Sequence, residues 1–266
     1  MPQKVIKGKA INPPAAVASD LSAAMIEMIT AMAKDIKRTL RGVFGENDLH
    51  TSAMDASITS QARIELNGLL TRWVSRFDEL AKYESARMVM RTRKQVKIGV
   101  KSSLREIAKH LSIDMTYTNA AMKEVIKAST LQAAQLIKLI PSEYIGEVQG
   151  EVMRSITSGK GMSDLVPFLT EKYEGRVKWA RHVAVDQTNK ATQAIGRAQV
   201  MALGCEEFEW IHTGGSKHPR KEHIALSGKT FRYDDPPVID SRTGEKGLPG
   251  QLPFCRCKQR PKFKLA

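Results

Sequence analysis

The chain has 266 residues, of which 42% are apolar and 26% charged, so it can bury a core as one large domain or two smaller ones. Its formal net charge of +14 favours an anionic partner, with nucleic acid ahead of an anionic protein surface or a membrane, over a solvated basic protein that has no such partner. We find no apolar run typical of a transmembrane helix, no secretory signal at the start and an odd number of cysteines, which together favour assembly in a reducing cytoplasm.

The N-terminal part is predicted to be an irregular arm followed by a helix. Residues 1–18 carry adjacent prolines and no periodic apolar pattern, so we expect no regular structure there. A helix should begin after Ser19 or Asp20, which are both good N-caps, and should break at the glycines of residues 41–48. Its apolar positions follow helical spacing: Leu21, Met25, Met28, Ile29, Met32, Ile36 and Leu40.

A helical pattern then continues through residues 55–111, which is very long for one helix. We predict a bent helix or a hairpin in preference to a single rod, with Gly68 and Gly99 as the weak points. The apolar positions are Ile64, Leu66, Leu69, Leu70, Trp73, Phe77, Leu80 and Ala81 in the first half, and Val89, Val96, Val100, Leu104, Ile107 and Leu111 in the second.

Basic side chains cover the opposite face of the second half. They fall within about 80° of one another at 100° per residue, and Glu106 alone opposes their charge. An ordinary solvated helix face is one interpretation. Such single-signed charge is best tolerated against an anion, so the pattern predicts contact with double-stranded DNA phosphate without sequence selection, or with an acidic partner subunit. The predicted DNA-binding residues are Arg87, Arg91, Lys94, Lys101, Arg105 and Lys109, with Arg93 and Lys97 beside them.

Four further helices are expected between Asp114 and Gly204. The first should end before Pro141, and the second should begin at Pro141 and Ser142 and end at the glycines of residues 159–161. A short helix capped by Ser163 and a long helix that ends at Gly204 should follow. The inward positions of the long helix are Val177, Ala180, Val183 or Ala184, Ala191, Ala194 or Ile195, Ala198 and Met201.

The composition changes beyond Gly204 to that of a small α+β module. Residues 206–213 alternate like a strand, residues 220–226 can form one or two helical turns, and residues 228–233 suit a second strand. The fold class predicted is a mainly α N-terminal and central helical region followed by a small α+β C-terminal module. The predicted divisions are an arm (1–18), a helical region with the basic helix (19–138), a helical lead-in (139–204) and the module with its basic tail (205–266).

Cys255 and Cys257 are the first candidates for chemistry. A Cys-x-Cys pair is too short for a relaxed disulfide, but it can supply two thiolates to one metal ion. The remaining zinc ligands would come from nearby histidines or from an acidic pair. Three interpretations stay open: a zinc site, buried cysteines that pack beneath the long loop, and a redox pair. The candidates for further ligands are His212, His218, His223, Asp234 and Asp235, and Cys205 is expected in the core.

Signatures of common catalytic sites are missing from the sequence. There is no P-loop, no nucleotide-binding glycine motif after a strand, no nucleophile elbow and no zinc-protease motif. His223 lies three residues after Arg220, so both share one face of a helical turn and the histidine can hydrogen-bond the loop that it covers. These patterns predict no catalytic residue.

An ordered set of motifs runs through the C-terminal part: a strand that ends in tryptophan, then R-x-x-H, L-x-G, P-G and C-R-C. In this order and spacing, residues 139–258 resemble the phage Mu F-like minor head proteins, also called phage head morphogenesis proteins. The chain departs from the family at Phe254, where asparagine is usual, at Gly215 or Ser216, and at residues 186–188. The matching positions are Trp210, Arg220, His223, Leu226, Gly228, Pro249, Gly250, Cys255, Arg256 and Cys257.

The resemblance implies a minor virion protein that associates with the portal and other head proteins and assists head assembly, DNA packaging or DNA delivery. It implies no enzymatic activity and a location in the phage head, after a stage in the host cytoplasm without membrane contact. Cys255, Cys257 and His223 are the candidate zinc ligands, although no cofactor is required. The alternatives are a metal-dependent DNA-processing enzyme and a nonspecific DNA-binding protein.

Overall fold

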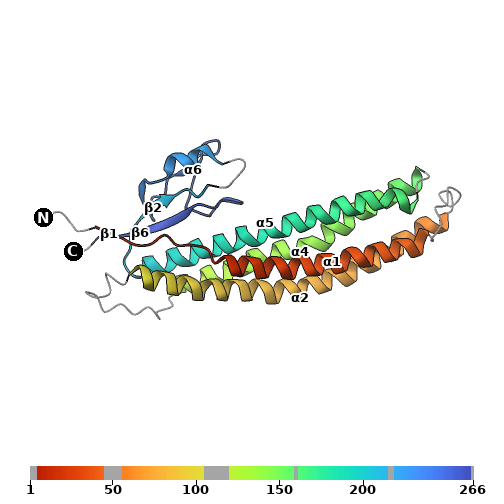
Figure 1. The fold of residues 1–266 in the computed structure, drawn as a ribbon, viewed down its shortest axis with the longest axis horizontal. Helices are drawn as coiled ribbons and strands as arrows, with labels where there is room; N and C mark the ends of the chain where they lie inside the picture. The colour runs from red at the N-terminus through yellow and green to blue at the C-terminus, as the bar shows by residue number, and fades with distance from the viewer. Residues whose placement is uncertain (1–4, 45–55, 105–119, 159–160, 215–218, 265–266) are drawn as a thin grey trace. The chain divides into compact units, whose positions relative to one another are not determined.

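The computed structural model describes residues 5–44, 56–104, 120–158, 161–214 and 219–264 (Figure 1). These residues form four long helices, α1 (Ala15–Phe44), α2 (Ala56–Ser103), α4 (Ala120–Thr157) and α5 (Met162–Ala202), followed by a small antiparallel sheet region. The predicted fold class is therefore confirmed. The chain divides into two compact units: unit 1 comprises residues 1–19, 86–131 and 184–266, and unit 2 comprises residues 20–85 and 132–183.

Unit 2 is held together by apolar helix faces. The predicted stripe of α1 is buried at Leu21, Met25 and Ile29 and continues along the helix with the same spacing. On α2, Trp73 and Phe77 are fully buried, with ring centroids 6.4 Å apart. The Trp73 indole donates a hydrogen bond of 3.1 Å to Asp35, so the few buried polar groups here are paired.

Several predicted helix ends were wrong. The first helix begins at Ala15, directly after the two prolines, because Pro at this position lacks only an amide hydrogen that a helix start does not use. Residues 56–103 form one continuous helix, so the predicted hairpin is wrong. Pro141 lies inside α4, and α5, which contains Pro167, continues through Gly175 between the expected short and long helices, so each expected pair of shorter helices is a single helix. Packing on neighbouring helices outweighs the local cost of these residues.

Two expected core positions are also corrected. Ile64 is 66% exposed although Ala62 and Leu66 are fully buried, because at 100° per residue it points to the opposite side of α2 from them. Met201 is 46% exposed and lies next to the last residue of α5. By length and mean hydropathy α1 would suffice to span a membrane, which the sequence analysis did not anticipate. Its buried residues lie on one face at helical spacing, however, as in a helix packed on protein.

Unit 1 contains the sheet, whose strand order is β1-β6-β2-β3 and whose neighbouring strands are antiparallel. Its strands are β1 (Val5–Lys7), β2 (Glu207–Ile211), β3 (Thr230–Arg232) and β6 (Lys258–Lys264). The short helix α6 (Lys221–Leu226) lies between β2 and β3 in the chain, and β4 (Val238–Asp240) pairs with β5 (Glu245–Lys246) in a separate hairpin.

Two strands of the sheet were missed in the sequence, as was the β4–β5 hairpin, which lies in the segment predicted to be a long loop. The predicted arm contributes β1, and the predicted basic tail is β6, which lies between β1 and β2. In β6, Gln259, Pro261 and Phe263 are buried while the residues between them are more exposed. That alternation is the pattern of a strand, and the lysines and arginines on its other face concealed it.

Candidate metal centre

A cluster of two cysteines and two histidines lies in unit 1. His212 follows the end of β2, His223 lies on α6, and Cys255 and Cys257 lie just before β6. The ligand atoms of His223, Cys255 and Cys257 all lie within 4.8 Å of one another, and all three residues are buried. The structure thus brings together three residues from two segments that are 32 residues apart in the chain.

The sulfur and nitrogen atoms of the cluster are closely spaced. Nδ1 of His223 lies 3.4 Å from Sγ of Cys255 and 3.5 Å from Sγ of Cys257. Nδ1 of His212 lies 3.6 Å from Sγ of Cys257. These contacts fit either thiol–imidazole hydrogen bonds or the edges of a metal coordination sphere.

The hydrogen bond on the far side of the His223 ring fixes its tautomer. Nε2 of His223 lies 3.2 Å from the carbonyl oxygen of Ile239, and a carbonyl can only accept. Nε2 therefore carries the hydrogen and donates it, which leaves the lone pair of Nδ1 directed at both sulfur atoms. The Trp210 ring packs edge-on against this imidazole, with centroids 5.2 Å apart.

The two thiols of the cluster differ in acidity. The pKa of Cys255 is lowered chiefly because the Cys257 thiol donates a hydrogen bond to its ionised form. The pKa of Cys257 is raised because it keeps the proton of that hydrogen bond and is buried. Trp210 opposes this rise, and its buried indole nitrogen has no conventional hydrogen-bond partner among the described residues. Cys205 lies apart from the cluster, and burial raises the pKa of its thiol to about 11.

Polar residues of α5 hold the segment that carries the cysteines. Asp186 accepts a hydrogen bond of 2.6 Å from the backbone N–H of Phe254, and the amide of Asn189 donates one of 2.7 Å to the carbonyl of Cys255. Both side chains are buried, and Lys190 forms an ion pair with Asp186 at 3.0 Å. The backbone on either side of Cys255 is thereby fixed to a helix.

Gln193 extends this polar contact to both ends of the chain. Its amide nitrogen donates to the carbonyl of Ile11 at 2.9 Å, and its side-chain oxygen accepts from the backbone of Gln259 at 3.1 Å. Gln259 in turn accepts a hydrogen bond of 2.7 Å from the hydroxyl of Tyr233. The roles of Asp186, Asn189, Gln193 and Gln259 were not predicted from the sequence. The spacing of the first three, by three and four residues along one helix face, was the available signal.

The other residues of the C-terminal motif lie around the cluster. Arg220 precedes α6 and donates a hydrogen bond of 3.1 Å to the carbonyl of Pro253. The backbone N–H of Gly228 donates to the carbonyl of Trp210 at 2.8 Å. Leu226 is half-buried, Arg256 is exposed, and Pro249 and Gly250 are buried before the cysteine segment.

The remaining candidate ligands are not in the cluster. Asp234 pairs with Arg232 at 2.8 Å and Asp235 pairs with Lys246 at 2.8 Å, and both acidic residues are exposed. His218 lies outside the described residues. The acidic pair is thus engaged in surface ion pairs, which contribute little to stability.

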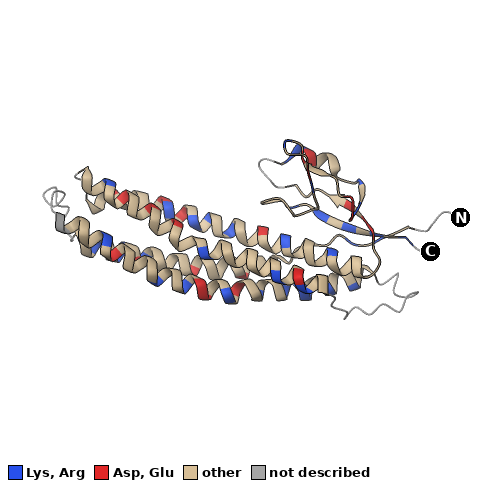
Figure 2. Cartoon of the chain, turned by 180° about the vertical axis from the view of Figure 1, so that it is seen from behind, with Lys and Arg blue, Asp and Glu red and all other residues tan. Residues whose placement is uncertain are grey.

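The basic residues predicted for DNA contact lie on α2 in unit 1. Arg87, Arg91, Lys94 and Lys101 are exposed, and Val89, Val96, Val100 and Leu104 on the other face are buried. The predicted residues Arg105 and Lys109, and the apolar residues Ile107 and Leu111, lie outside the described residues. The charges of the helices are drawn in Figure 2.

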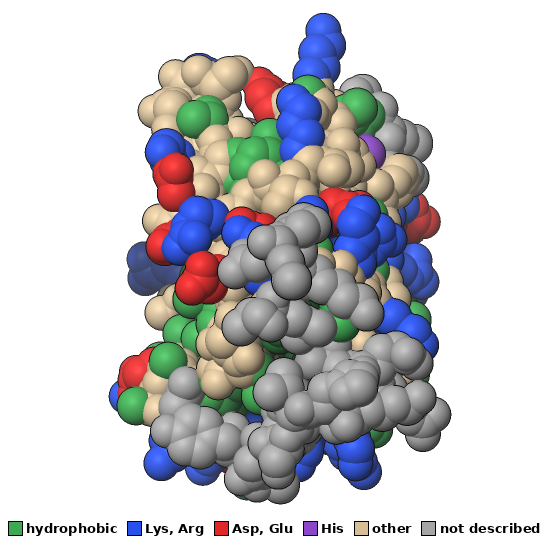
Figure 3. Space-filling model, turned by 90° about the vertical axis from the view of Figure 1, so that its left-hand side faces the viewer, with side chains coloured by type: hydrophobic (Ala, Val, Ile, Leu, Met, Phe, Trp, Pro, Cys, Tyr) green, Lys and Arg blue, Asp and Glu red, His purple; other side chains and the backbone are tan. Residues whose placement is uncertain are grey.

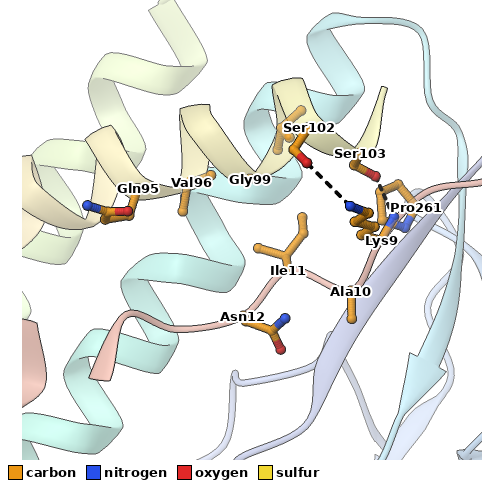
Figure 4. A pocket seen from close by; sticks show the side chains of 11 residues that line it. Lys9, Ala10, Ile11, Asn12, Gln95, Val96, Gly99, Ser102, Ser103 and Pro261 are labelled. Atoms are coloured by element: carbon orange, nitrogen blue, oxygen red, sulfur yellow. Dashed lines mark hydrogen bonds between the residues drawn. The ribbon is translucent and has the colours of Figure 1, made fainter. Parts of the chain in front are cut away.

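A cavity of about 160 Å³ lies between the segment after β1 and the end of α2, also in unit 1 (Figure 4). Ile11 and Val96 contribute apolar surface, and the ammonium of Lys9 lies 3.4 Å from the hydroxyl of Ser102. Its lining contains no histidine, cysteine or carboxylate among the described residues. The described lining of the cavity therefore lacks the usual side-chain ligands of metal ions.

Comparison with known proteins finds similarity to one family over the segment that contains the cluster. The family model described as Phage Mu protein F like protein matches residues 146–260, which confirms the expected resemblance over this segment. A protein of Haemophilus influenzae (strain Rd) described as uncharacterized is 30% identical over 138 residues. The match covers 52% of this chain and 29% of that protein, so the chain spans less than a third of the relative's length. No solved structure matches the chain.

Proposed function

We propose that this chain, whose residues 146–260 carry the phage Mu F-like domain, is a minor head protein of a tailed phage that acts in head morphogenesis. The family match is the observation that carries the proposal. The partners would be other head proteins, with the portal foremost, and the location would be the virion after assembly in the host cytoplasm. The motif residues lie around one buried cluster. This arrangement supports the proposal that the C-terminal module anchors the chain in a larger assembly.

A structural role fits the site better than catalysis. His223, Cys255 and Cys257 are buried, and His223 is engaged on both ring nitrogens. A catalytic group must reach a substrate. The backbone around the cysteines is held by α5 and not by a movable loop.

Co-purification tests the assembly role. The tagged chain should recover the portal protein from cells in which the phage or prophage that encodes it is induced. Purified particles should also contain the chain or a processed form of it. A chain that is absent from both the portal fraction and the particles would contradict the proposal, whereas its presence on the portal alone would restrict its action to assembly.

The basic face of α2 supports contact with packaged DNA. Residues 86–103 contain no Asp or Glu, and their basic residues are Arg87, Arg91, Arg93, Lys94, Lys97 and Lys101. By contrast, Lys and Arg side chains are interspersed with Asp and Glu on the described part of the face in Figure 3. A row of exposed cations about one helical turn apart can follow a phosphate backbone without reading bases.

The salt dependence of DNA binding tests this contact. Replacement of Arg87, Arg91, Lys94 and Lys101 with Gln should lower the slope of log K against log salt by up to about 3–4, since each phosphate contact contributes about 0.9. The matched control replaces four exposed basic residues elsewhere on the helices and removes the same charge. An equal loss of slope in both variants would show that net charge, and not this face, binds DNA. The control residues are Arg63, Lys82, Lys123 and Lys127.

A further inference from the structure

We propose that Cys255, Cys257, His223 and His212 form a four-ligand structural zinc site that fastens the segment before β6 to β2 and α6. The proposal rests on the geometry of the cluster and stands independently of the role in the phage head. Nothing in the family match assigns a metal to these residues.

The spacing of the donor atoms fits tetrahedral zinc. Zn–S bonds of about 2.3 Å and Zn–N bonds of about 2.0–2.1 Å, at a tetrahedral angle, place sulfur and nitrogen roughly 3.6 Å apart. The three sulfur–nitrogen separations in the cluster are 3.4, 3.5 and 3.6 Å. These three sulfur–nitrogen pairs therefore match the edges of a coordination sphere. Among the described residues, His223, Cys255 and Cys257 have ligand atoms that all lie within 4.8 Å of one another, and His212 reaches this group through its contact with Cys257.

The hydrogen bonds around the donors also suit a metal. Nε2 of His223 donates to the carbonyl of Ile239, so Nδ1 is the free donor atom, and imidazole ligands of zinc commonly make this kind of outer hydrogen bond. The buried Trp210 indole N–H has no conventional partner among the described residues and lies near Cys257, where a metal-bound thiolate would attract it. The amide of Asn189 holds the carbonyl of Cys255 and so fixes that ligand from behind.

The donor set selects the metal and its role. Two thiolates and two imidazoles favour zinc over magnesium or calcium, which prefer oxygen ligands. Their two negative charges neutralise Zn²⁺, which lowers the free-energy cost of burying the ion. Four protein ligands leave no open position for water, so the site would be structural and not catalytic.

The ligands join three separate parts of the module. His212 follows β2, His223 lies on α6, and the cysteines come after the long segment that contains the β4–β5 hairpin. The strands of the sheet have three to seven residues, and small modules of this kind commonly need a metal or a disulfide for stability. All three cysteines are free thiols, so no disulfide supplies this link.

Metal analysis of the full chain tests the proposal. Protein that is refolded with zinc and passed over a desalting column should retain about one zinc per chain. Cobalt in its place should give the intense visible bands of a tetrahedral ion and a thiolate charge-transfer band in the near ultraviolet. Wild-type protein that stays folded without retaining zinc, and binds cobalt only with an octahedral spectrum, would overturn the site.

Three variants assign the ligands. Cys257→Ser should abolish retention of zinc and the thiolate band, whereas Cys205→Ser, a matched change at a buried thiol outside the cluster, should keep both. His212 is half-buried, so His212→Ala should fold and bind zinc about 10–100-fold or more weakly, given that even loss of an outer-shell residue costs this much. Zinc retention in Cys257→Ser, or unchanged affinity in His212→Ala, would refute the four-ligand assignment.

Discussion

The two halves of α5 bury different kinds of side chain. Residues 162–183 lie in unit 2 and bury apolar side chains such as Leu165, Leu169 and Ala180. The continuation in unit 1 buries a polar run at Asp186, Gln187, Thr188, Asn189, Thr192 and Gln193. The helix thus packs through apolar contacts in unit 2, whereas in unit 1 buried hydrogen-bonding side chains add to its apolar contacts at residues such as Ala191 and Ile195.

The difference follows from what each half contacts. In unit 2 the partners are apolar side chains of other helices, which need shape and volume but no particular register. In unit 1 the partners are backbone groups of two other segments. One is the arm, at Ile11, and the other is the closing segment that carries Phe254, Cys255 and Gln259. Because each bond needs its own donor and acceptor, the polar half fixes the register of segments that have little core of their own.

The largest expected loss of stability comes from a substitution that removes a buried hydrogen bond of the polar half of α5 and keeps the size of the side chain. Gln193→Glu removes the amide donor to Ile11 and places a negative charge in a buried site, so it should destabilise the protein by about 3 kcal/mol. Urea denaturation monitored by circular dichroism would measure this loss.

Gln149→Glu on α4 is the matched control for that substitution. Gln149 also donates through its amide, to Asn67 at 3.0 Å, but this contact is exposed. Its replacement should cost a few tenths of a kcal/mol. Equal losses at both positions would show that burial of the polar run contributes nothing.

A smaller effect is expected where the closing segment crosses the polar half. Gly250 has φ of 81°, and a Cβ at this position would lie 2.9 Å from Cγ of Gln193. Gly250→Ala should therefore cost about 2 kcal/mol, from backbone strain and from displacement of Gln193. Gly244 has φ of 70°, but an added Cβ would meet no described atom within 4 Å, so Gly244→Ala should cost only about 1 kcal/mol. Thermal melting of both variants would separate steric contact from strain.

The smallest expected effect is a gain in stability. Phe254 has φ of 57°, a conformation that asparagine tolerates and bulky residues avoid, and its side chain is 55% exposed. Phe254→Asn should stabilise the protein by about 0.5–1 kcal/mol, since the hydrogen bond from its N–H to Asp186 does not depend on the side chain. Phe254→Ala keeps a Cβ in the same conformation and should not give this gain. If both variants raise the melting temperature equally, removal of the exposed ring is the cause and not relief of strain.

The helical part of the chain could be predicted from the periodic spacing of its apolar residues. Most of the predicted stripe of α1 and of the predicted apolar face of α2 is buried, with Ile64 as the exposed exception, because a helix buries residues at a fixed spacing whatever its partner. The ends of helices were harder to predict. Pro141 and Pro167 break helices in isolation, but tertiary packing supports the chain on both sides of each.

The sequence by itself determined the helical class, the apolar faces, the small C-terminal module and the family resemblance, because each depends on residues that are neighbours in the chain or stand at fixed spacings. Tertiary structure alone decided that the basic tail is an inner strand of the sheet, that the arm adds β1, and that polar residues of α5 are buried. It also decided which histidines meet Cys255 and Cys257. These outcomes depend on hydrogen bonds and contacts between residues far apart in the chain, and no local spacing encodes such pairs.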